Sequence, residues 1–438
     1  MTTTGGSIPG AVDMPPTIDE IVRTLTLQAG FNTTSVIVGT TLLGIAAGLI
    51  GAFALLRKRS LTADALSHAT LPGICIAFLA APSLGLAPRS MPVLMIGAAI
   101  TGVLGVVCIH LLITKTRLRE DASIGIVLSV FFGLGVVLLS VIQTNASGNA
   151  AGLNHFIYGQ TAAMTRSDTI TMGVIGVFSA AVALLLLKEL SLVCFNDSFA
   201  RATGIPAWLM DTVILGLIVL VTVSGLQAVG LILIVAMLII PAASARFWTE
   251  RLWKLILLSA LIGGASGYAG SSVSALLPRK PAGSVIVLTA GALFAASMFL
   301  APARGVLATA LRRARIRWRI ANDHLLEYLF ENTNTSPGRP LSDIADEHGI
   351  PSLRFKLLAK ALQIRGFITM SNGVATLTHI GSARGARVAR NHALWEQYLI
   401  THADIAPSHV DWSVDQVEHV LDDELVRRLE RLLAESRA

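Results

Sequence analysis

About nine stretches of roughly 20 mainly apolar residues fill most of the first 305 residues of this 438-residue chain. A helix of that length and composition crosses the hydrocarbon core of a bilayer, where a segment must satisfy its own backbone hydrogen bonds. The sequence therefore predicts an all-α polytopic membrane domain over residues 35–305, with eight or ten spans as alternatives to nine. The predicted spans lie near residues 35–56, 61–82, 91–114, 122–143, 169–188, 208–228, 230–246, 253–275 and 283–303.

The charges predict a second, soluble part. Residues 305–438 carry 17 of the 34 Lys and Arg and 16 of the 27 Asp and Glu, although this part is less than half as long as the part before it. The net charge of +7 therefore arises almost wholly in the membrane part. Such an excess is typical of membrane topology and not of a nucleic-acid surface. Overall, 53% hydrophobic residues and a mean hydropathy of +0.68 exclude an ordinary soluble protein.

Basic residues predict the orientation of the spans. Loops with several Lys and Arg face the cytoplasm, and such clusters follow every second predicted span, from Arg57 after the first to Arg319 after the last. This alternation puts the polar segment 1–34 outside and the C-terminus in the cytoplasm. The pair Arg279 and Lys280 is the main conflict with this topology.

The second predicted span contains two residues with metal-ligand chemistry. Asp64 and His68 are four residues apart, so they share one face of a helix. A carboxylate and an imidazole suit a divalent first-row metal, and ionisable groups inside a membrane usually face a partner or a pore. Pro72 lacks an N–H, which frees the carbonyl of His68 as a further oxygen. The alternative is that Asp64 lies at the membrane rim and His68 is a packed polar residue.

Three blocks of the membrane part resemble the metal-ion permease family of bacterial ABC importers. The blocks are Leu56–Phe78, Gly152–Gln160 and Val229–Arg246, and the resemblance extends over residues 35–305. It implies a place in the inner membrane of a bacterium and transport of manganese, zinc or iron(II). It also implies a separate ATPase subunit, an extracytoplasmic metal-binding protein, and pairing with a second permease, identical or related. No GxxxxGK[ST] loop occurs in the chain, so we expect it to bind no nucleotide and to be no enzyme.

Two short stretches fit the same resemblance. Residues 196–206 lie between the fifth and sixth predicted spans, where the family has a helical segment that docks on the ATPase; an amphipathic connector is the alternative. Pro241 lies within the seventh predicted span and is followed by four small residues. Small residues allow close helix packing, so the sequence predicts a kinked, tightly packed pore helix there.

The soluble part has the pattern of a winged helix-turn-helix. After a basic juxtamembrane linker over 306–320, a helix, a helix-turn-helix over 340–365, and two short strands around Asn372 and Gly373 occupy residues 321–380. Residues 381–438 are predicted to form a helical metal-binding and dimerisation region. Together these predict a small α+β domain behind the membrane domain.

The same part resembles the iron- and manganese-dependent repressors of bacteria, through residues 321–331, 387–399 and 414–433. The resemblance implies a metal site, whose candidate ligands are Asp323, His392, Glu396, Asp411, Asp415, Glu418 and His419. Asp323 and Asp415 stand where iron-type members have sulfur-bearing side chains. Oxygen ligands favour manganese. The alternative is that these side chains only form a solvated helix surface.

The sequence thus predicts the permease subunit of an ATP-driven importer of a divalent metal, manganese first and zinc or iron next. We expect Asp64 and His68 to lie on the path and the tail to sense metal and regulate transport. Membrane lipid surrounds the spans, and we do not expect DNA as a partner because the tail is nearly neutral. The alternatives are a membrane-tethered, metal-responsive transcription regulator and a secondary metal carrier that needs no ATPase.

Overall fold

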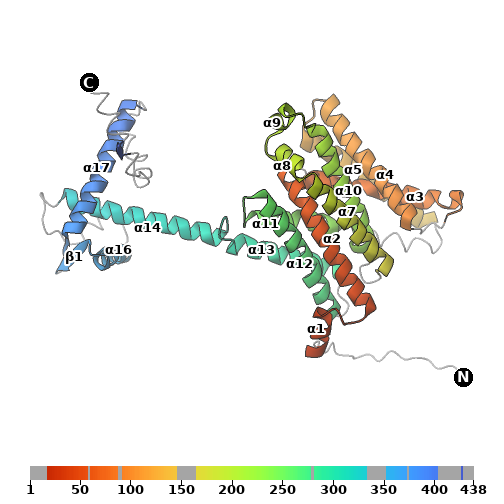
Figure 1. The fold of residues 1–438 in the computed structure, drawn as a ribbon, viewed down its shortest axis with the longest axis horizontal. Helices are drawn as coiled ribbons and strands as arrows, with labels where there is room; N and C mark the ends of the chain where they lie inside the picture. Colours follow the sequence, from red (N-terminus) through yellow and green to blue (C-terminus); the bar gives the residue numbers. More distant parts are fainter. Residues whose placement is uncertain are drawn as a thin grey trace. The chain divides into compact units, whose positions relative to one another are not determined.

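The structure is a computed structural model that describes residues 17–57, 60–86, 91–145, 164–277, 281–332, 352–371, 374–402 and 426–427. The chain divides into two compact units, Met1–Ala308 and Thr309–Ala438. Each is described by itself, and Figure 1 gives the labels of their helices and strands.

The first unit is built from helices. They are α1 (Ile18–Leu25), α2 (Phe31–Leu56), α3 (Ser60–Ala80), the 3₁₀ turn η1 (Pro82–Leu84), α4 (Met91–Lys115), α5 (Glu120–Asn145), α7 (Arg166–Leu185), α8 (Leu187–Phe195), α9 (Asp197–Ala202), α10 (Ala207–Val229), α11 (Leu231–Arg246), α12 (Leu252–Leu276) and α13 (Ala282–Leu300). The all-α membrane domain predicted from the sequence is therefore confirmed.

The number of full-length spans is smaller than nine. Within the described residues, eight helices are long and apolar enough to cross a membrane, and α11 is the shorter apolar helix that stands for the predicted span 230–246. The 16 residues of α11 rise only about 24 Å. This helix packs against α2, α12 and α13, so it belongs to the bundle although it is shorter than the full-length spans.

Backbone contacts hold α2 against α11 and α12. A Cβ atom added at Gly51 would lie 1.8 Å from the carbonyl oxygen of Leu238, and one at Gly44 would lie 2.2 Å from that of Gly263. Ser259 donates a hydrogen bond of 2.5 Å to the carbonyl of Gly48. Glycine at these positions lets the helix axes approach until their backbones touch.

Helices α3, α4 and α5 form a second packed group within the unit (Figure 1). Gly73 of α3 meets Gly97 of α4 so closely that a Cβ on either glycine would lie within 2.5 Å of the other's carbonyl oxygen. Pro72 lies inside α3, where its missing N–H cannot bond the carbonyl four residues earlier. The close packing of these three helices therefore fixes the position of the turn of α3 that begins at His68.

Helix α1 was not predicted from the sequence and lies within the segment 1–34. Thr17 and Glu20 form a capping box at its start, with each side chain bonded to the other residue's backbone N–H. The Thr-x-x-Glu spacing was the available signal. Tyr268 of α12 donates a hydrogen bond to the carbonyl of Leu25, which fixes α1 against the helix bundle.

The core of the second unit packs around one long helix. From the sequence, this stretch was predicted as two separate parts, a linker and the start of the winged helix. Helix α14 runs from Val306 to Glu331, through both the predicted linker and the start of the predicted winged helix. Leu325 and Leu326 on α14 pack against Phe355 and Leu358 of α16 (Ser352–Ile364). Helices α14 and α16 therefore share one apolar core.

The wing is a two-stranded antiparallel sheet. Strand β1 (Ile368–Ser371) pairs with β2 (Val374–Leu377), with Ile368 opposite Leu377 and Ser371 opposite Val374. Helix α17 (His379–His402) follows and begins two residues before the helical region predicted over 381–438. The first part of the predicted helix-turn-helix, the turn residues Asn372 and Gly373, and nearly all of the predicted helical region after residue 402 lie outside the described residues.

Candidate metal centres

Asp64 and His68 lie on one face of α3, as their spacing predicts. The Nε2 atom of His68 is 3.7 Å from Oδ1 of Asp64, which is longer than a hydrogen bond. The side chains keep 22% and 37% of their surface exposed, for His68 and Asp64 respectively. The pair is therefore neither a closed ion pair nor sealed in the helix bundle, and both groups remain available to a third partner.

The ring of His68 has one contact that positions it and one atom without a partner. Phe132 of α5 packs edge to face against the imidazole, with 4.8 Å between ring centroids. Nδ1 is buried and has no hydrogen-bond partner. A buried, unpaired ring nitrogen is costly, so packing and not a hydrogen bond holds the ring. Nε2, which faces Asp64, is the nitrogen available to a cation. The sequence offered no signal for Phe132, which lies 64 residues away.

One chain supplies too few donors for a complete site in the described region. Among the described residues, no group of three or more His, Cys, Asp and Glu side chains could hold a metal ion. The resembling block Gly152–Gln160 lies outside those residues. His110 of α4 is exposed at the helix surface, and Cys75 of α3 is fully buried beside the carbonyl of Gly135. Neither joins Asp64 and His68.

A charged cluster joins the C-terminal end of α2 to the helices that follow the fifth span. Arg57 donates hydrogen bonds of 2.7 and 2.6 Å to the two carboxylate oxygens of Asp211 on α10. It also donates to Asp197 in the first turn of α9, at 2.8 Å, and to the carbonyl of Val193 on α8, at 2.9 Å. From the sequence, Arg57 served only to predict the orientation of the spans. Its partners Asp197 and Asp211 lie near the two ends of the stretch 196–211, and their acidic character was the available signal.

The cluster is held in its charged form. Burial alone would lower the pKa of Arg57, but the two carboxylates outweigh burial and raise it. Burial alone would raise the pKa of Asp197, but hydrogen bonds from Arg57 and Arg201 outweigh that effect and lower it. Cys194 is different, since burial raises the pKa of its thiol to about 11. The segment that contains α9, predicted as a docking helix, is thus fixed to the bundle by charge.

In the second unit, Asp323 is held by an arginine. Nε and Nη2 of Arg384 on α17 lie 3.2 and 3.0 Å from Oδ1 of Asp323, and Nη2 lies 3.1 Å from Oδ2. Asp323 is buried, with 6% of its surface exposed. The paired guanidinium neutralises this carboxylate, which therefore needs no metal to be stable in the interface between α14 and α17.

His392, the second predicted ligand of this unit, faces another acid. Its Nδ1 lies 3.3 Å from Oε1 of Glu327, which is one helical turn beyond Asp323 and also buried. Glu327 was not among the ligands predicted from the sequence, although its i,i+4 spacing from Asp323 was a usable signal. Carboxylates and imidazole are donors that suit manganese, but within the described residues this interface does not gather three of them into a group that could hold a metal ion.

The other predicted ligands of the tail are less fully placed. The backbone of Glu396 lies in α17, one turn after His392. Asp411, Asp415, Glu418 and His419 lie outside the described residues. The structure therefore places Asp323 and His392 in the interface between α14 and α17, each beside a different partner, Arg384 for Asp323 and Glu327 for His392.

Comparisons with known proteins agree with this division of the chain. A family model described as the ABC 3 transport family matches residues 31–301, and one described as the iron dependent repressor, metal binding and dimerisation domain, matches residues 378–437. Both resemblances drawn from the sequence are confirmed. The second match includes α17 and the residues after it.

Individual relatives cover most of the chain. It is 38% identical over 377 residues to the manganese transport system membrane protein MntC of Bacillus subtilis, which is 86% of each chain. It is 42% identical to the zinc transport system membrane protein TroC of Treponema pallidum, over 66% of this chain and 96% of that one. The solved structure of PsaBC from Streptococcus pneumoniae in complex with Fab matches with a TM-score of 0.57 and 32% identity, over 66% of this chain and 98% of the other.

The family model covers more than half of the chain, and its bounds coincide with α2 through α13. The all-helical fold, the apolar spans and the relatives all indicate the same family. The chain is a multi-pass membrane protein that belongs to the ABC 3 transport family.

Proposed function

We propose that this chain is the permease subunit of an ATP-driven importer of a divalent transition metal, and that manganese is its main substrate. The observation that carries this proposal is the pair on α3: Nε2 of His68 faces Oδ1 of Asp64 at 3.7 Å, and both side chains are partly exposed. The family and the printed names of the two relatives support the substrate class. Oxygen and imidazole donors suit manganese and also zinc.

A second permease copy, identical or related, would complete the path. One chain brings two side-chain donors and the carbonyl of His68, whereas first-row divalent ions take four to six ligands. Two copies facing each other through α3 would bring four side chains. Metal handed over on the outside would then pass between the copies while ATP turnover in the partner subunit alternates the gates.

Uptake of manganese by cells tests the pair. Asp64→Asn and His68→Gln each keep the size of the side chain but weaken the donor set, so we expect uptake to fall by at least ten-fold while the assembled complex persists. Asp121→Asn and His110→Gln change exposed residues of the same types on α5 and α4 and serve as matched controls. Normal uptake in both test variants would refute the path.

Two further partners follow from this proposal. We propose that α9 docks on a separate ATPase subunit, since the cluster of Arg57, Asp197 and Asp211 ties this helix to two spans. An extracytoplasmic metal-binding protein would deliver the ion to the opposite face. Basic loops orient the chain with its N-terminus outside and its C-terminus in the cytoplasm. Transport by the chain alone in vesicles, without an ATPase, would instead support a secondary carrier.

We also propose that the cytoplasmic tail senses metal and regulates transport. The match to a metal-binding and dimerisation domain and the position of the candidate ligands Asp323 and His392 in the interface between α14 and α17 support this role. A metal that binds one arrangement of the tail more tightly than another shifts the balance between the two. Regulation of transcription would need DNA binding, and chromatin crosslinking that recovers enriched DNA would favour that alternative.

Metal binding by the full chain tests the tail. Manganese bound at equilibrium is counted by electron paramagnetic resonance in the wild type and in a variant with Glu418→Gln and His419→Gln. We expect the variant to lose one class of bound manganese and to transport at the same rate in low and high cytosolic metal. Unchanged stoichiometry and unchanged inhibition in the variant would remove the tail from metal sensing.

A further inference from the structure

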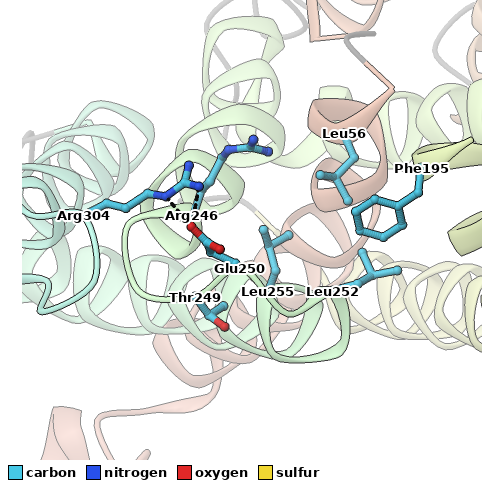
Figure 2. Close-up of a pocket in the computed structure, with 8 residues that line it drawn as sticks. All are labelled: Leu56, Phe195, Arg246, Thr249, Glu250, Leu252, Leu255 and Arg304. Carbon is cyan, nitrogen blue, oxygen red and sulfur yellow. Dashed lines mark hydrogen bonds and ion pairs between the residues drawn. The ribbon is translucent and has the colours of Figure 1, made fainter. Parts of the chain in front are cut away.

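A hollow of about 240 Å³ opens near the C-terminal end of α2, on the side of the first unit that contains Arg304 (Figure 2). Residues from α2, α8, α11, α12 and the loops beside them line it. They are Leu56, Phe195, Arg246, Thr249, Glu250, Leu252, Leu255 and Arg304. No role assigned above involves this hollow.

One wall of the hollow is positively charged. Arg304 directs Nε and Nη2 at a single oxygen of Glu250, with Nε at 3.0 Å. Its backbone N–H also bonds the carbonyl of Phe247, at 3.2 Å, which fixes the loop. Arg246 is exposed and makes no ion pair within the part of the chain that the structure describes. Two arginines against one glutamate leave a formal charge of +1 on the wall.

The other wall is apolar. Leu56, Leu252 and Leu255 lie opposite the arginines, together with the exposed ring of Phe195 (Figure 2). Trp248 and Trp253, on either side of this loop in the sequence, are 42% and 57% exposed. Exposed tryptophans at the ends of membrane helices are typical of the headgroup level of a bilayer. The hollow therefore combines an anion-binding wall and an apolar wall at that level.

We propose that this hollow binds the phosphate headgroup of an anionic phospholipid of the cytoplasmic leaflet. Arg246 takes the phosphate, Arg304 adds charge, and the leucines receive the first part of an acyl chain. Basic pockets between membrane helices on the cytoplasmic side are suited to such headgroups. The cytoplasmic assignment rests on the orientation given under the proposed function, whereas the binding itself does not depend on transport.

The size of the hollow favours a headgroup over a whole nucleotide. Pockets that enclose a drug-sized ligand are roughly 300–1,000 Å³, and about 240 Å³ lies below that range. Free phosphate shares the chemistry of the headgroup but has no use for the apolar wall. Lipid and free phosphate can therefore be separated by experiment.

Native mass spectrometry of the full chain, purified in detergent, tests the proposal. The protein is titrated with phosphatidylglycerol, phosphatidylcholine or sodium phosphate, and the bound species are counted. The variants are Arg246→Gln, Glu250→Gln, which removes the competing carboxylate, and Arg251→Gln, which changes an exposed arginine of the same loop that does not line the hollow. All three positions are exposed, so the variants should fold.

We expect phosphatidylglycerol to bind about five-fold more weakly to Arg246→Gln, more tightly to Glu250→Gln, and unchanged to Arg251→Gln, with weaker binding of phosphatidylcholine throughout. Equal losses in Arg246→Gln and Arg251→Gln would show diffuse attraction to a basic surface and overturn the site. Displacement of the lipid by millimolar phosphate would overturn the choice of a lipid. An affinity for phosphatidylglycerol that none of the three substitutions changes would also overturn the proposed site.

Discussion

Two nitrogens of Arg57 donate hydrogen bonds to the two carboxylate oxygens of Asp211, at 2.7 and 2.6 Å, and so join the end of α2 to α10. The two residues are 154 positions apart in the sequence. The third nitrogen of the same guanidinium reaches Asp197 in α9. One side chain therefore fixes the position of a short helix that we propose as the docking element for the ATPase.

Substituting Arg57 should uncouple this helix. In Arg57→Gln the carboxylate of Asp211, 20% exposed, loses its two hydrogen bonds from the guanidinium, and we expect a loss of stability on the order of 2 kcal/mol. The remaining folded protein should copurify poorly with its ATPase and transport little. Thermal unfolding in detergent and copurification measure the two effects.

The matched control is Arg23→Gln. Arg23 pairs with Asp19 on the surface of α1, where both side chains are more than 60% exposed, and exposed pairs contribute little. We expect no measurable change in either assay. Equal copurification of Arg57→Gln and wild type would mean that α9 does not need this anchor.

Adding a single methyl group at Gly51 should disrupt the membrane unit. A Cβ at this position would overlap the carbonyl oxygen of Leu238, which cannot move without its helix. We expect Gly51→Ala to destabilise the protein by about 1–3 kcal/mol or more. The control Gly133→Ala lies on α5, where no atom is within 4 Å of the added Cβ. Equal melting temperatures for the two variants would contradict the backbone contact.

Phe132→Leu should weaken the metal path without abolishing it. The edge-to-face contact with His68 contributes about 0.5–1.5 kcal/mol, so the apparent KM for manganese should rise about two- to ten-fold while the maximal rate stays similar. Phe178→Leu changes an exposed ring on α7 and is the control. A fall in maximal rate with an unchanged KM would show that Phe132 does not act through the imidazole.

Cys194 should react slowly with alkylating reagents at neutral pH. Burial raises the pKa of its thiol from 9.0 to about 11, and only the thiolate reacts, so at pH 7.5 the reactive fraction falls about 100-fold. The rate should still be rising steeply between pH 9 and 10. A cysteine at an exposed site, in Ser167→Cys, should approach its plateau there. Mass spectrometry of alkylated peptides measures both rates, and parallel pH profiles would contradict the shift.

Local pattern was enough to predict much of this molecule. The apolar runs predict the spans to within a few residues, and the i,i+4 spacing of Asp64 and His68 predicts their shared face because a helix places such residues one turn apart. The turn between short strands predicts the wing. In each case the deciding interaction lies within a few residues along the chain.

The contacts that the sequence did not predict are long-range or depend on packing. The partner of Asp323 is Arg384, 61 positions away, and no local pattern selects one arginine among several. The linker at 306–320 is different, because its helix could have been predicted: residues 306–331 contain no Gly or Pro, and Ala, Leu and Arg are strong helix formers. The density of arginines suggested a connector, although the backbone preference was helical.

The interlocked glycines of α2 and α12 have a consequence for movement. Backbones in direct contact leave no room for a side chain between them, so sliding of α2 along α12 would bring bulkier residues against a carbonyl. We infer that these two helices move together. If Asp64 and His68 lie on the path as proposed, a movement that alternates access has to involve α3, the helix that carries them.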